Sequence, residues 1–194
     1  EWWALKTIYD KGLLYKGYKI VPYCPRCGTA LSSHEVAQGY KDVKETSAIA
    51  KFFLKDGSGE CILAWTTTPW TLPSNVALCV NAHETYVRAR KEEQVYILAQ
   101  ALVQSVLGED AEILESFPGE KLVGMEYEPL FDMSAQFGKK QGYRVVADDY
   151  VTLGEGTGVV HIAPAFGEDD NRVGREWELP FLQLVNTSGH LCGG

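Results

Sequence analysis

The chain has 194 residues and a formal net charge of −8, and 45% of its residues are hydrophobic against 23% charged. This composition is ordinary for a globular protein, and the length is sufficient for a domain with its own core. The excess of acidic residues argues against a protein that binds a nucleic-acid backbone along its length, because such proteins carry basic patches. No apolar run approaches the roughly 20 residues of a membrane helix, and the N-terminus has no signal-peptide pattern, so no membrane partner is expected.

Residues 1–45 differ in character from the rest, and we expect them to form the root of the main domain. Apolar residues at helical spacing predict a helix over residues 2–15, although Gly12 weakens its far end. A short strand is expected over residues 19–23, running into the tight turn Cys24-Pro25-Arg26-Cys27-Gly28.

Cys24 and Cys27 have the spacing of one half of a zinc knuckle. A structural zinc site needs four ligands and typically uses two such pairs, but no second pair is present. The residues that could complete the set stand at unconvincing spacings: His34, Cys61, Cys79, His190 and Cys192. We predict no complete metal site in this chain. The odd number of cysteines also gives no disulfide framework, so we expect reduced thiols in a cytoplasmic protein.

From residue 47 onward the pattern is mainly that of short strands. Strands are expected over residues 48–54, 61–67, 75–80, 86–90, 95–98, 112–117, 144–147, 158–162 and 181–185. A hairpin turn is expected over residues 56–59, and helices over residues 99–107 and 168–178. Such a pattern predicts an α+β, mainly β fold with a barrel-like core and flanking helices. We expect the main domain over residues 46–190 and a tail over 191–194. The start at Glu1 rather than Met predicts a piece of a longer protein.

The segment Trp65-Thr66-Thr67-Thr68-Pro69-Trp70 places three hydroxyl groups where a strand ends. Thr66 and Thr68 should point to one side of the strand and Thr67 to the other. Pro69 favours an extended Thr68 and gives the sheet no donor, so the chain should leave the sheet here on a stiffened loop. Hydroxyl groups donate and accept hydrogen bonds, which suits a site for a water, an ester or a ribose. The structural alternative is a strand end rich in residues of high sheet propensity.

A second group of residues follows the glycines of Gly154-Glu155-Gly156-Thr157-Gly158, whose spacing is not the dinucleotide-binding fingerprint. The expected strand after them carries His161, for which a purely structural role is the alternative. The next helix begins after Gly167 with three acidic residues, which the helix dipole favours.

Only one of these acids lies on the apolar stripe of that helix. Asp170 follows Phe166 by four residues and precedes Val173 by three, whereas Asp169 points elsewhere and can serve as a cap. A carboxylate that points inward needs a cation or a hydrogen-bond donor. No lysine or arginine is evident for Asp170, so we expect the ammonium group of a ligand.

Together, residues 65–75 and 156–170 resemble the editing domain of isoleucyl-tRNA synthetases, the insertion into class I synthetases known as connective peptide 1. The resemblance covers nearly the whole chain, including residues 22–31 at the root of the insertion. Thr68-Pro69-Trp70 and His161 favour the isoleucyl type, because valyl and leucyl relatives carry Arg-Pro after the threonines and lack the histidine. The resemblance implies a barrel-like fold and hydrolysis of valyl-tRNA(Ile). Its implied partners are the 3′ end of aminoacylated tRNA(Ile), the valine moiety and the rest of the synthetase.

The resemblance also implies a role for each site residue. Asp170 binds the α-ammonium group, and Thr67 and Thr68 position the amino acid, the terminal adenosine and the attacking water. His161 excludes the larger isoleucine side chain. The remaining substrate-binding residues are Thr66, Trp70, Thr71 and Asn75, with Trp65 and Trp70 as walls.

An aminoacyl ester is already activated, so a placed water and stabilisation of the developing oxyanion are sufficient for its hydrolysis. We expect help from the free hydroxyl of the terminal ribose, and no cofactor. Structural zinc and ATP binding are expected of the full-length protein only, because the His-Ile-Gly-His and Lys-Met-Ser-Lys-Ser signatures of the synthetic core are absent. The alternatives are a valyl- or leucyl-type editing domain, a non-catalytic tRNA- or protein-binding module, and a zinc hydrolase.

Overall fold

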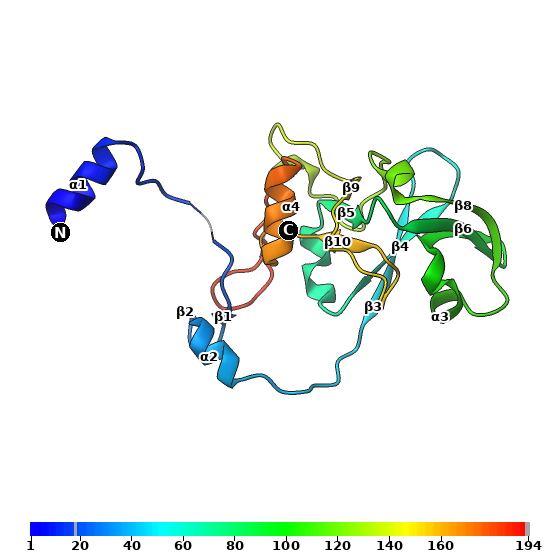
Figure 1. Cartoon of the computed structure of the whole chain (residues 1–194), viewed down its shortest axis with the longest axis horizontal. Coiled ribbons are helices and arrows are strands. Elements are labelled where there is room, and N and C mark those ends of the chain that lie inside the picture. The colour runs from blue at the N-terminus through cyan, green and yellow to red at the C-terminus, as the bar shows by residue number, and fades with distance from the viewer. Residues whose placement is uncertain (18, 193–194) are drawn as a thin grey trace.

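The computed structural model describes residues 1–17 and 19–192 (Figure 1). Within these residues eight strands form one sheet: β3 (Ala48–Phe53), β4 (Cys61–Thr66), β5 (Ala77–Val80), β6 (Thr85–Lys91), β7 (Gln94–Ala99), β8 (Glu112–Pro118), β9 (Arg144–Ala147) and β10 (Val160–Ile162). The α-helices of this part are α3 (Val103–Leu107) and α4 (Glu168–Glu176). Short 3-10 helices are η1 (Pro69–Ser74), η2 (Gln100–Leu102), η3 (Gly119–Leu122) and η4 (Ser134–Gln136).

Strand β4 is the point at which the sheet divides. One edge of β4 pairs antiparallel with β3 along its whole length. The other edge is shared by two parallel neighbours, β7 at Cys61 and Ile62 and β10 at Trp65. The branch through β7 continues to β6 and β8, and the branch through β10 continues to β5 and β9. The end of β4, where the threonines lie, is therefore next to β10.

Residues 124–128 close the second branch into a barrel. On one side the N–H of Tyr127 donates to the carbonyl of Tyr143 at 3.1 Å, just before β9. On the other side the N–H of Glu128 donates to the carbonyl of Phe53 at 2.7 Å, at the end of β3. The sheet thus curls from β3 through β4, β10, β5 and β9 back to β3, which confirms the predicted barrel-like core.

Apolar side chains fill the barrel, and a smaller cluster lies between the β7–β6 branch and α3. The largest buried side chains of the main core include Phe52, Ile62, Leu78, Tyr127, Ile162 and Leu179. The smaller cluster contains Cys61, Leu63, Val87, Leu98, Val103 and Leu107. Burial of one such large side chain contributes about 1.5–3 kcal/mol, so this core is what holds the site in place.

The predicted hairpin between β3 and β4 is confirmed. The carboxylate of Asp56 accepts a hydrogen bond from the N–H of Ser58 at 2.9 Å, and Gly57 and Gly59 have φ values of 79° and 75°. These left-handed conformations explain why glycine stands at both positions.

The root contains α1 (Trp2–Asp10), β1 (Tyr23–Cys24), β2 (Thr29–Ala30) and α2 (Ser33–Gln38). Helix α1 ends five residues before the predicted end at residue 15, and Gly12 beyond it has a φ of 68°. The strand predicted over residues 19–23 is wrong, because only Tyr23 and Cys24 pair, and they pair with the short strand after the cysteine turn.

Helix α2 was not predicted from the sequence, although its start carries a clear signal. The hydroxyl of Ser32 accepts the N–H of Glu35, and the carboxylate of Glu35 accepts the N–H of Ser32. This reciprocal capping box is readable from the Ser-x-x-Glu spacing.

The strand predicted over residues 181–185 is also wrong. The alternation behind the prediction is real, since Leu182 and Leu184 are buried. They pack onto the barrel without a strand ladder, and only an isolated bridge joins Val185 to Leu191. This C-terminal segment lies beside β1 in Figure 1, and the phenol of Tyr23 donates to the carbonyl of Thr187 at 3.0 Å.

The domain boundaries remain predictions, and Gly193 and Gly194 of the predicted tail lie outside the described residues. None of the helices in the described ranges has the length and apolar character needed to cross a bilayer.

Candidate active site

The two motifs singled out in the sequence meet where β4 and β10 end side by side. Trp65 of β4 is in register with Val160 of β10, so the next residues on the two strands are neighbours. The loops that follow also touch, because the ring of Trp70 in η1 meets the ring of Phe166 edge-on at 5.5 Å. Segments about 90 residues apart in sequence therefore form one site.

Three threonine hydroxyl groups form a connected cluster at this point. The N–H of Thr68 donates to Oγ1 of Thr66 at 3.0 Å, and the two hydroxyl oxygens are 3.4 Å apart. Thr71 donates to the carbonyl of Thr68 at 2.8 Å, and its hydroxyl lies 3.4 Å from that of Thr68. Thr66 and Thr68 thus share one side, as predicted, while Thr67 is exposed.

His161 joins the cluster from β10. Its Nε2 is 3.0 Å from Oγ1 of Thr71, and burial lowers the pKa of the imidazole to about 4. The imidazole is therefore neutral at pH 7. Because the hydroxyl of Thr71 donates to a carbonyl, Nε2 of His161 carries the hydrogen and donates to Thr71, which leaves Nδ1 as an acceptor. In the described part of the chain this buried Nδ1 has no hydrogen-bond partner.

Asp170 lies in the first turn of α4 and reaches back to the end of β10. Its Oδ2 accepts the N–H of Ala163 at 3.0 Å, two residues beyond His161. The side chain is half-buried, and burial raises the pKa of the carboxyl to about 6, with a smaller contribution from the charge of Asp169. A β-carbon at Gly167 would lie 2.9 Å from Cγ of Asp170, so the carboxyl group needs glycine there.

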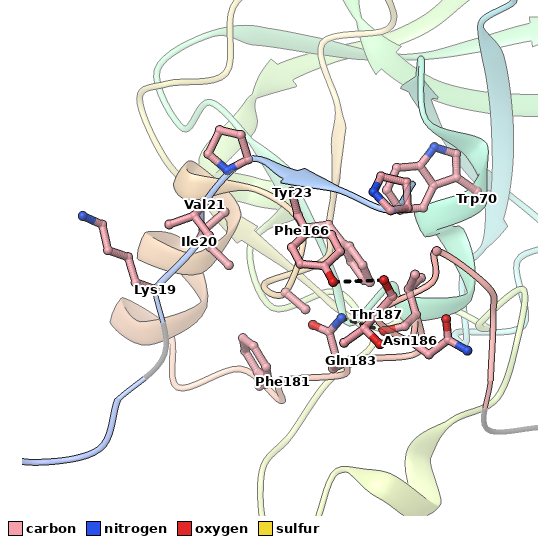
Figure 2. A pocket seen from close by; sticks show the side chains of 15 residues that line it. Lys19, Ile20, Val21, Tyr23, Trp70, Phe166, Phe181, Gln183, Asn186 and Thr187 are labelled. Atoms are coloured by element: carbon pink, nitrogen blue, oxygen red, sulfur yellow. Dashed lines mark hydrogen bonds between the residues drawn. The ribbon is translucent and has the colours of Figure 1, made fainter. Parts of the chain in front are cut away.

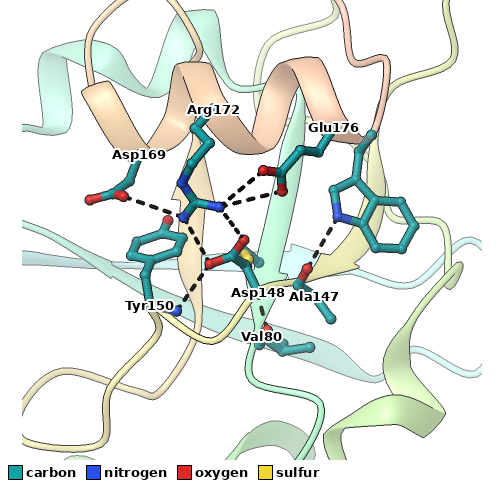
Figure 3. Close-up of polar contacts among 9 residues, drawn as sticks. Val80, Ala147, Asp148, Tyr150, Asp169, Arg172 and Glu176 are labelled. Carbon is teal, nitrogen blue, oxygen red and sulfur yellow. Dashed lines mark hydrogen bonds and ion pairs between the residues drawn. The ribbon is translucent and has the colours of Figure 1, made fainter.

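The arginine nearest to Asp170 in sequence is engaged by three other acids (Figure 3). Arg172 makes a bidentate pair with Asp148 at 2.7 and 2.9 Å, and contacts Asp169 at 3.3 Å and Glu176 at 3.3 Å. Among the described residues no lysine or arginine lies within ion-pair distance of Asp170.

The predicted cap by Asp169 is wrong. Gly167 is the N-cap of α4 and no side chain caps the helix, because the carboxylate of Asp169 turns to Arg172 instead. Spacings of three and four residues from Arg172 to Asp169 and Glu176 are signals that the sequence analysis missed. The pairing with Asp148 has no such local signal.

The glycines before β10 have a structural role beside the site. Gly156 has a φ of 76°, and a β-carbon there would lie 3.0 Å from the side chain of Trp65. Gly158 has a φ of 72°, and a β-carbon there would lie 2.4 Å from that of Ala99. Residues 156–158 therefore pack closely against the ends of β4 and β7, and Gly156 contacts the side chain of Trp65.

The structure separates the two remaining predicted contact residues. Trp70 is 51% exposed, so its indole remains accessible to a ligand. Asn75 is buried, its amide donates to the carbonyl of Ala77 at 2.8 Å, and its Oδ1 accepts the phenol of Tyr127 at 2.6 Å. The contact predicted between Asn75 and adenosine remains a prediction, and inside the protein its side chain joins η1 to the barrel.

Another polar group near the site was not predicted. The hydroxyl of Tyr150 is buried and has no hydrogen-bond partner among the described residues, and the guanidinium of Arg172 lies 5.9 Å from its ring. The sequence around Tyr150 has no feature that marks it.

The two root thiols supply half of a zinc site and the described residues supply no more. Hydrogen bonds from the backbone N–H and then the thiol of Cys27 lower the pKa of Cys24, and the hydrogen bond with the Cys24 side chain raises the pKa of Cys27. In the described residues, no three histidine, cysteine, aspartate or glutamate side chains come together as a metal-binding group. Cys61 and Cys79 are fully buried in the sheet, which rules them out as further ligands at the root. The residues present therefore do not fit a complete zinc site.

Comparison with known proteins identifies relatives over almost the entire chain. The isoleucine--tRNA ligase of Clostridium acetobutylicum is 59% identical over 188 residues, which are 97% of this chain and 18% of that protein. The isoleucine--tRNA ligase of Bacillus thuringiensis is 55% identical over the same shares. The chain thus spans 18% of the length of these curated relatives. Their identity confirms the resemblance to isoleucyl-tRNA synthetases.

Solved structures of similar fold are editing domains of leucyl-tRNA synthetases. The crystal structure of GlLeuRS-CP1 matches with a TM-score of 0.57 and 15% identity, covering 68% of this chain and 59% of that one. The editing domain of the P.knowlesi cytosolic leucyl-tRNA synthetase matches with a TM-score of 0.56 and 16% identity, covering 73% of this chain and 67% of that one. At such identities the likeness shows the fold alone. The family model of tRNA synthetases class I (I, L, M and V) matches residues 1–121, more than half of the chain, and the chain therefore belongs to that family.

Proposed function

We propose that this chain is the editing domain of an isoleucine-specific synthetase and hydrolyses the ester between valine and the terminal ribose of tRNA(Ile). The observation that carries the proposal is Asp170. It is half-buried and has no cationic partner among the described residues, and it accepts the N–H of Ala163, two residues beyond the His161 that contacts the threonine cluster. A buried carboxylate of this kind is suited to an ammonium group of a ligand.

The site supplies binding and orientation for the reaction. Asp170 holds the α-ammonium group of the amino acid, which places the ester carbonyl near the hydroxyl cluster. Thr68 orients the attacking water from within the cluster and Thr67 from the exposed side of the same loop, and hydroxyl donors stabilise the oxyanion that develops on the carbonyl. Asp170 is then paired with the ammonium group and is a poor general base, so the free hydroxyl of the terminal ribose assists the water.

His161 provides selectivity through its shape. The neutral imidazole is fixed by its bond to Thr71, so it forms a rigid wall with no charge. A pocket sized for valine excludes the extra methylene of isoleucine by overlap with that wall. A second site of this kind is needed because a synthetic pocket rejects a smaller side chain poorly, a limit for which isoleucine against valine is the standard example.

The remaining partners follow from this role. The 3′ end of aminoacylated tRNA(Ile) and the rest of a synthetase are the proposed macromolecular partners, in the cytoplasm. Cysteine ligands from that remainder would complete a structural zinc site with Cys24 and Cys27. No step of the hydrolysis depends on it.

The test is deacylation of valyl-tRNA(Ile) by a full-length synthetase that carries this chain. Asp170→Asn should lower kcat/KM at least about 30-fold, since truncating one partner of a buried charge pair costs roughly 2–5 kcal/mol. Asp169→Asn is the matched control, because its carboxylate pairs with Arg172 on the helix surface, and it should keep nearly the full rate. Equal rates for wild type and Asp170→Asn would contradict the assigned role and favour a non-catalytic tRNA-binding module.

A further inference from the structure

A cavity of about 710 Å³ lies next to the candidate active site, between the root and the C-terminal segment (Figure 2). Three parts of the chain line it: residues 19–25 of the root, the ring pair of Trp70 and Phe166, and residues 181–189. We call it the root cavity. It shares Trp70 and Phe166 with the active site, so a ligand chain leaving one can enter the other.

Direct contacts hold the two outer walls of the root cavity together. The phenol of Tyr23 donates to the carbonyl of Thr187 at 3.0 Å, as drawn in Figure 2. Gly189 approaches Pro25 so closely that a β-carbon added at Gly189 would lie 2.9 Å from Cβ of Pro25. The cavity is therefore built by the fold, and a ligand would find it largely pre-formed.

The charge of the lining differs from that of the whole chain. The chain has 26 acidic against 18 basic residues. Among the described residues, the lining of the root cavity contains no aspartate or glutamate, and it includes Lys19 at one end. An acid-free wall with one ammonium group is complementary to a ligand that carries a single negative charge.

The side chains of the lining also have a recognisable combination of chemistry. Aromatic rings come from Tyr23, Trp70, Phe166 and Phe181, and carboxamide groups come from Gln183 and Asn186. Trp70 is 51% exposed, so part of its indole is accessible to a ligand, and Phe181 contributes a partly exposed ring to the same lining. Aromatic faces stack on nucleobases, amides read the hydrogen-bonding edges of bases, and a lysine pairs with a phosphate.

We propose that the root cavity binds the nucleotide that precedes the terminal adenosine of the RNA 3′ end. This rests on the proposed function, which places the ester of that adenosine beside Asp170 and the threonine cluster. The backbone then crosses Trp70 and Phe166, the preceding base stacks among the rings, and Lys19 contacts a phosphate. A cavity of this volume has room for one nucleotide.

The test compares two valyl esters as substrates of the 194-residue chain, one of adenosine and one of the dinucleotide CpA. The CpA ester should have a KM roughly 5- to 100-fold lower, the gain expected from one base stacked on aromatic side chains. Phe181→Ala should remove this gain and leave hydrolysis of the adenosine ester unchanged, which also shows that the variant folds. If it fails on both esters, Phe181→Leu replaces it. Tyr40→Ala is the control, since Tyr40 is 81% exposed and lies outside the lining.

The outcomes separate this proposal from the proposed function. Equal KM values for the two esters would overturn the root-cavity site, and so would a lower KM for the CpA ester that persists in both Phe181 variants. Neither result would contradict the proposed hydrolytic function. A gain seen with the chain but lost in a full synthetase would mean that the rest of the polypeptide fills the cavity, and would also overturn it. If neither ester is hydrolysed, the proposed function fails. Binding of CpA against adenosine, with and without Phe181→Ala, then tests the cavity directly: preference for CpA supports it, and equal binding refutes it.

Discussion

Replacing Asp170 by asparagine should stabilise the fold at neutral pH while it removes the proposed hydrolytic activity. Asparagine has the same shape as aspartate, and its Oδ1 can accept the N–H of Ala163 as the carboxylate does at 3.0 Å. It carries no charge that the partly buried position disfavours. The variant therefore keeps the local contact and loses only the cost of holding a carboxylate without a cation.

The magnitude follows from the pKa of the group. Burial raises the pKa of Asp170 from 3.8 to about 6, so between these values the folded chain binds more protons than the unfolded chain. Stability from this group is complete below pH 4 and is lost as the pH rises through about 6. At about 1.4 kcal/mol per pH unit the loss is at most about 3 kcal/mol, and partial exposure reduces it to about 1–2 kcal/mol.

The assay is denaturant unfolding of the 194-residue chain and of Asp170→Asn from pH 4 to pH 8. The free energies of unfolding should agree near pH 4, and the variant should become the more stable protein above pH 6. Other titrating groups, among them His161 with its pKa lowered to about 4, are common to both proteins and cancel in the difference. A variant that is less stable at pH 7.5, or a difference that does not change with pH, would refute the reasoning.

Three further predictions concern the packing and selectivity of the site. His161→Ala should widen the pocket, so a full synthetase with this change should deacylate cognate isoleucyl-tRNA(Ile); continued sparing of isoleucine would contradict the proposed wall. Tyr127→Phe leaves Oδ1 of Asn75 buried without its 2.6 Å donor. It should lower the free energy of unfolding by about 1–3 kcal/mol in a denaturant titration, and no change would show that another donor replaces the phenol. Gly158→Ala should lower the melting temperature much more than Gly57→Ala. Both glycines have positive φ, but a β-carbon at Gly158 would lie 2.4 Å from a side-chain atom of β7, whereas the surroundings of Gly57 are open within 4 Å. Equal shifts would show that the backbone near β10 yields to the added carbon.

The sequence predicted those elements whose signals are local. Strands β3 and β4 and the turn between them were expected within a residue of their observed ends, because the turn carries Asp-Gly-Ser-Gly and the strands are apolar. Residues 181–185 show where this reasoning fails. Alternating burial predicts a strand, but a strand also requires a free neighbouring edge, and the position of the edges is a property of the whole barrel.

The same distinction applies to the site. The shared side of Thr66 and Thr68 and the inward position of Asp170 follow from strand and helix periodicity, and the structure confirms both. The pairing of Arg172 with Asp148 joins α4 to the end of β9, and no spacing in the sequence predicts this ion pair. Contacts between distant segments decide which charged groups are neutralised, so they also decide which carboxylate remains for a ligand.

The distribution of partners along α4 supports the proposal that Asp170 binds the ammonium group of a ligand. Arg172 engages Asp148, Asp169 and Glu176, so these three acids are already paired with a cation. Asp170 instead accepts one backbone N–H and is raised in pKa by burial. An ammonium group that binds beside it favours the charged carboxylate and so lowers that pKa, which links binding to release of the proton. The free energy that destabilises the empty site is therefore recovered when the ligand binds, and a neutral ligand of the same shape cannot recover it.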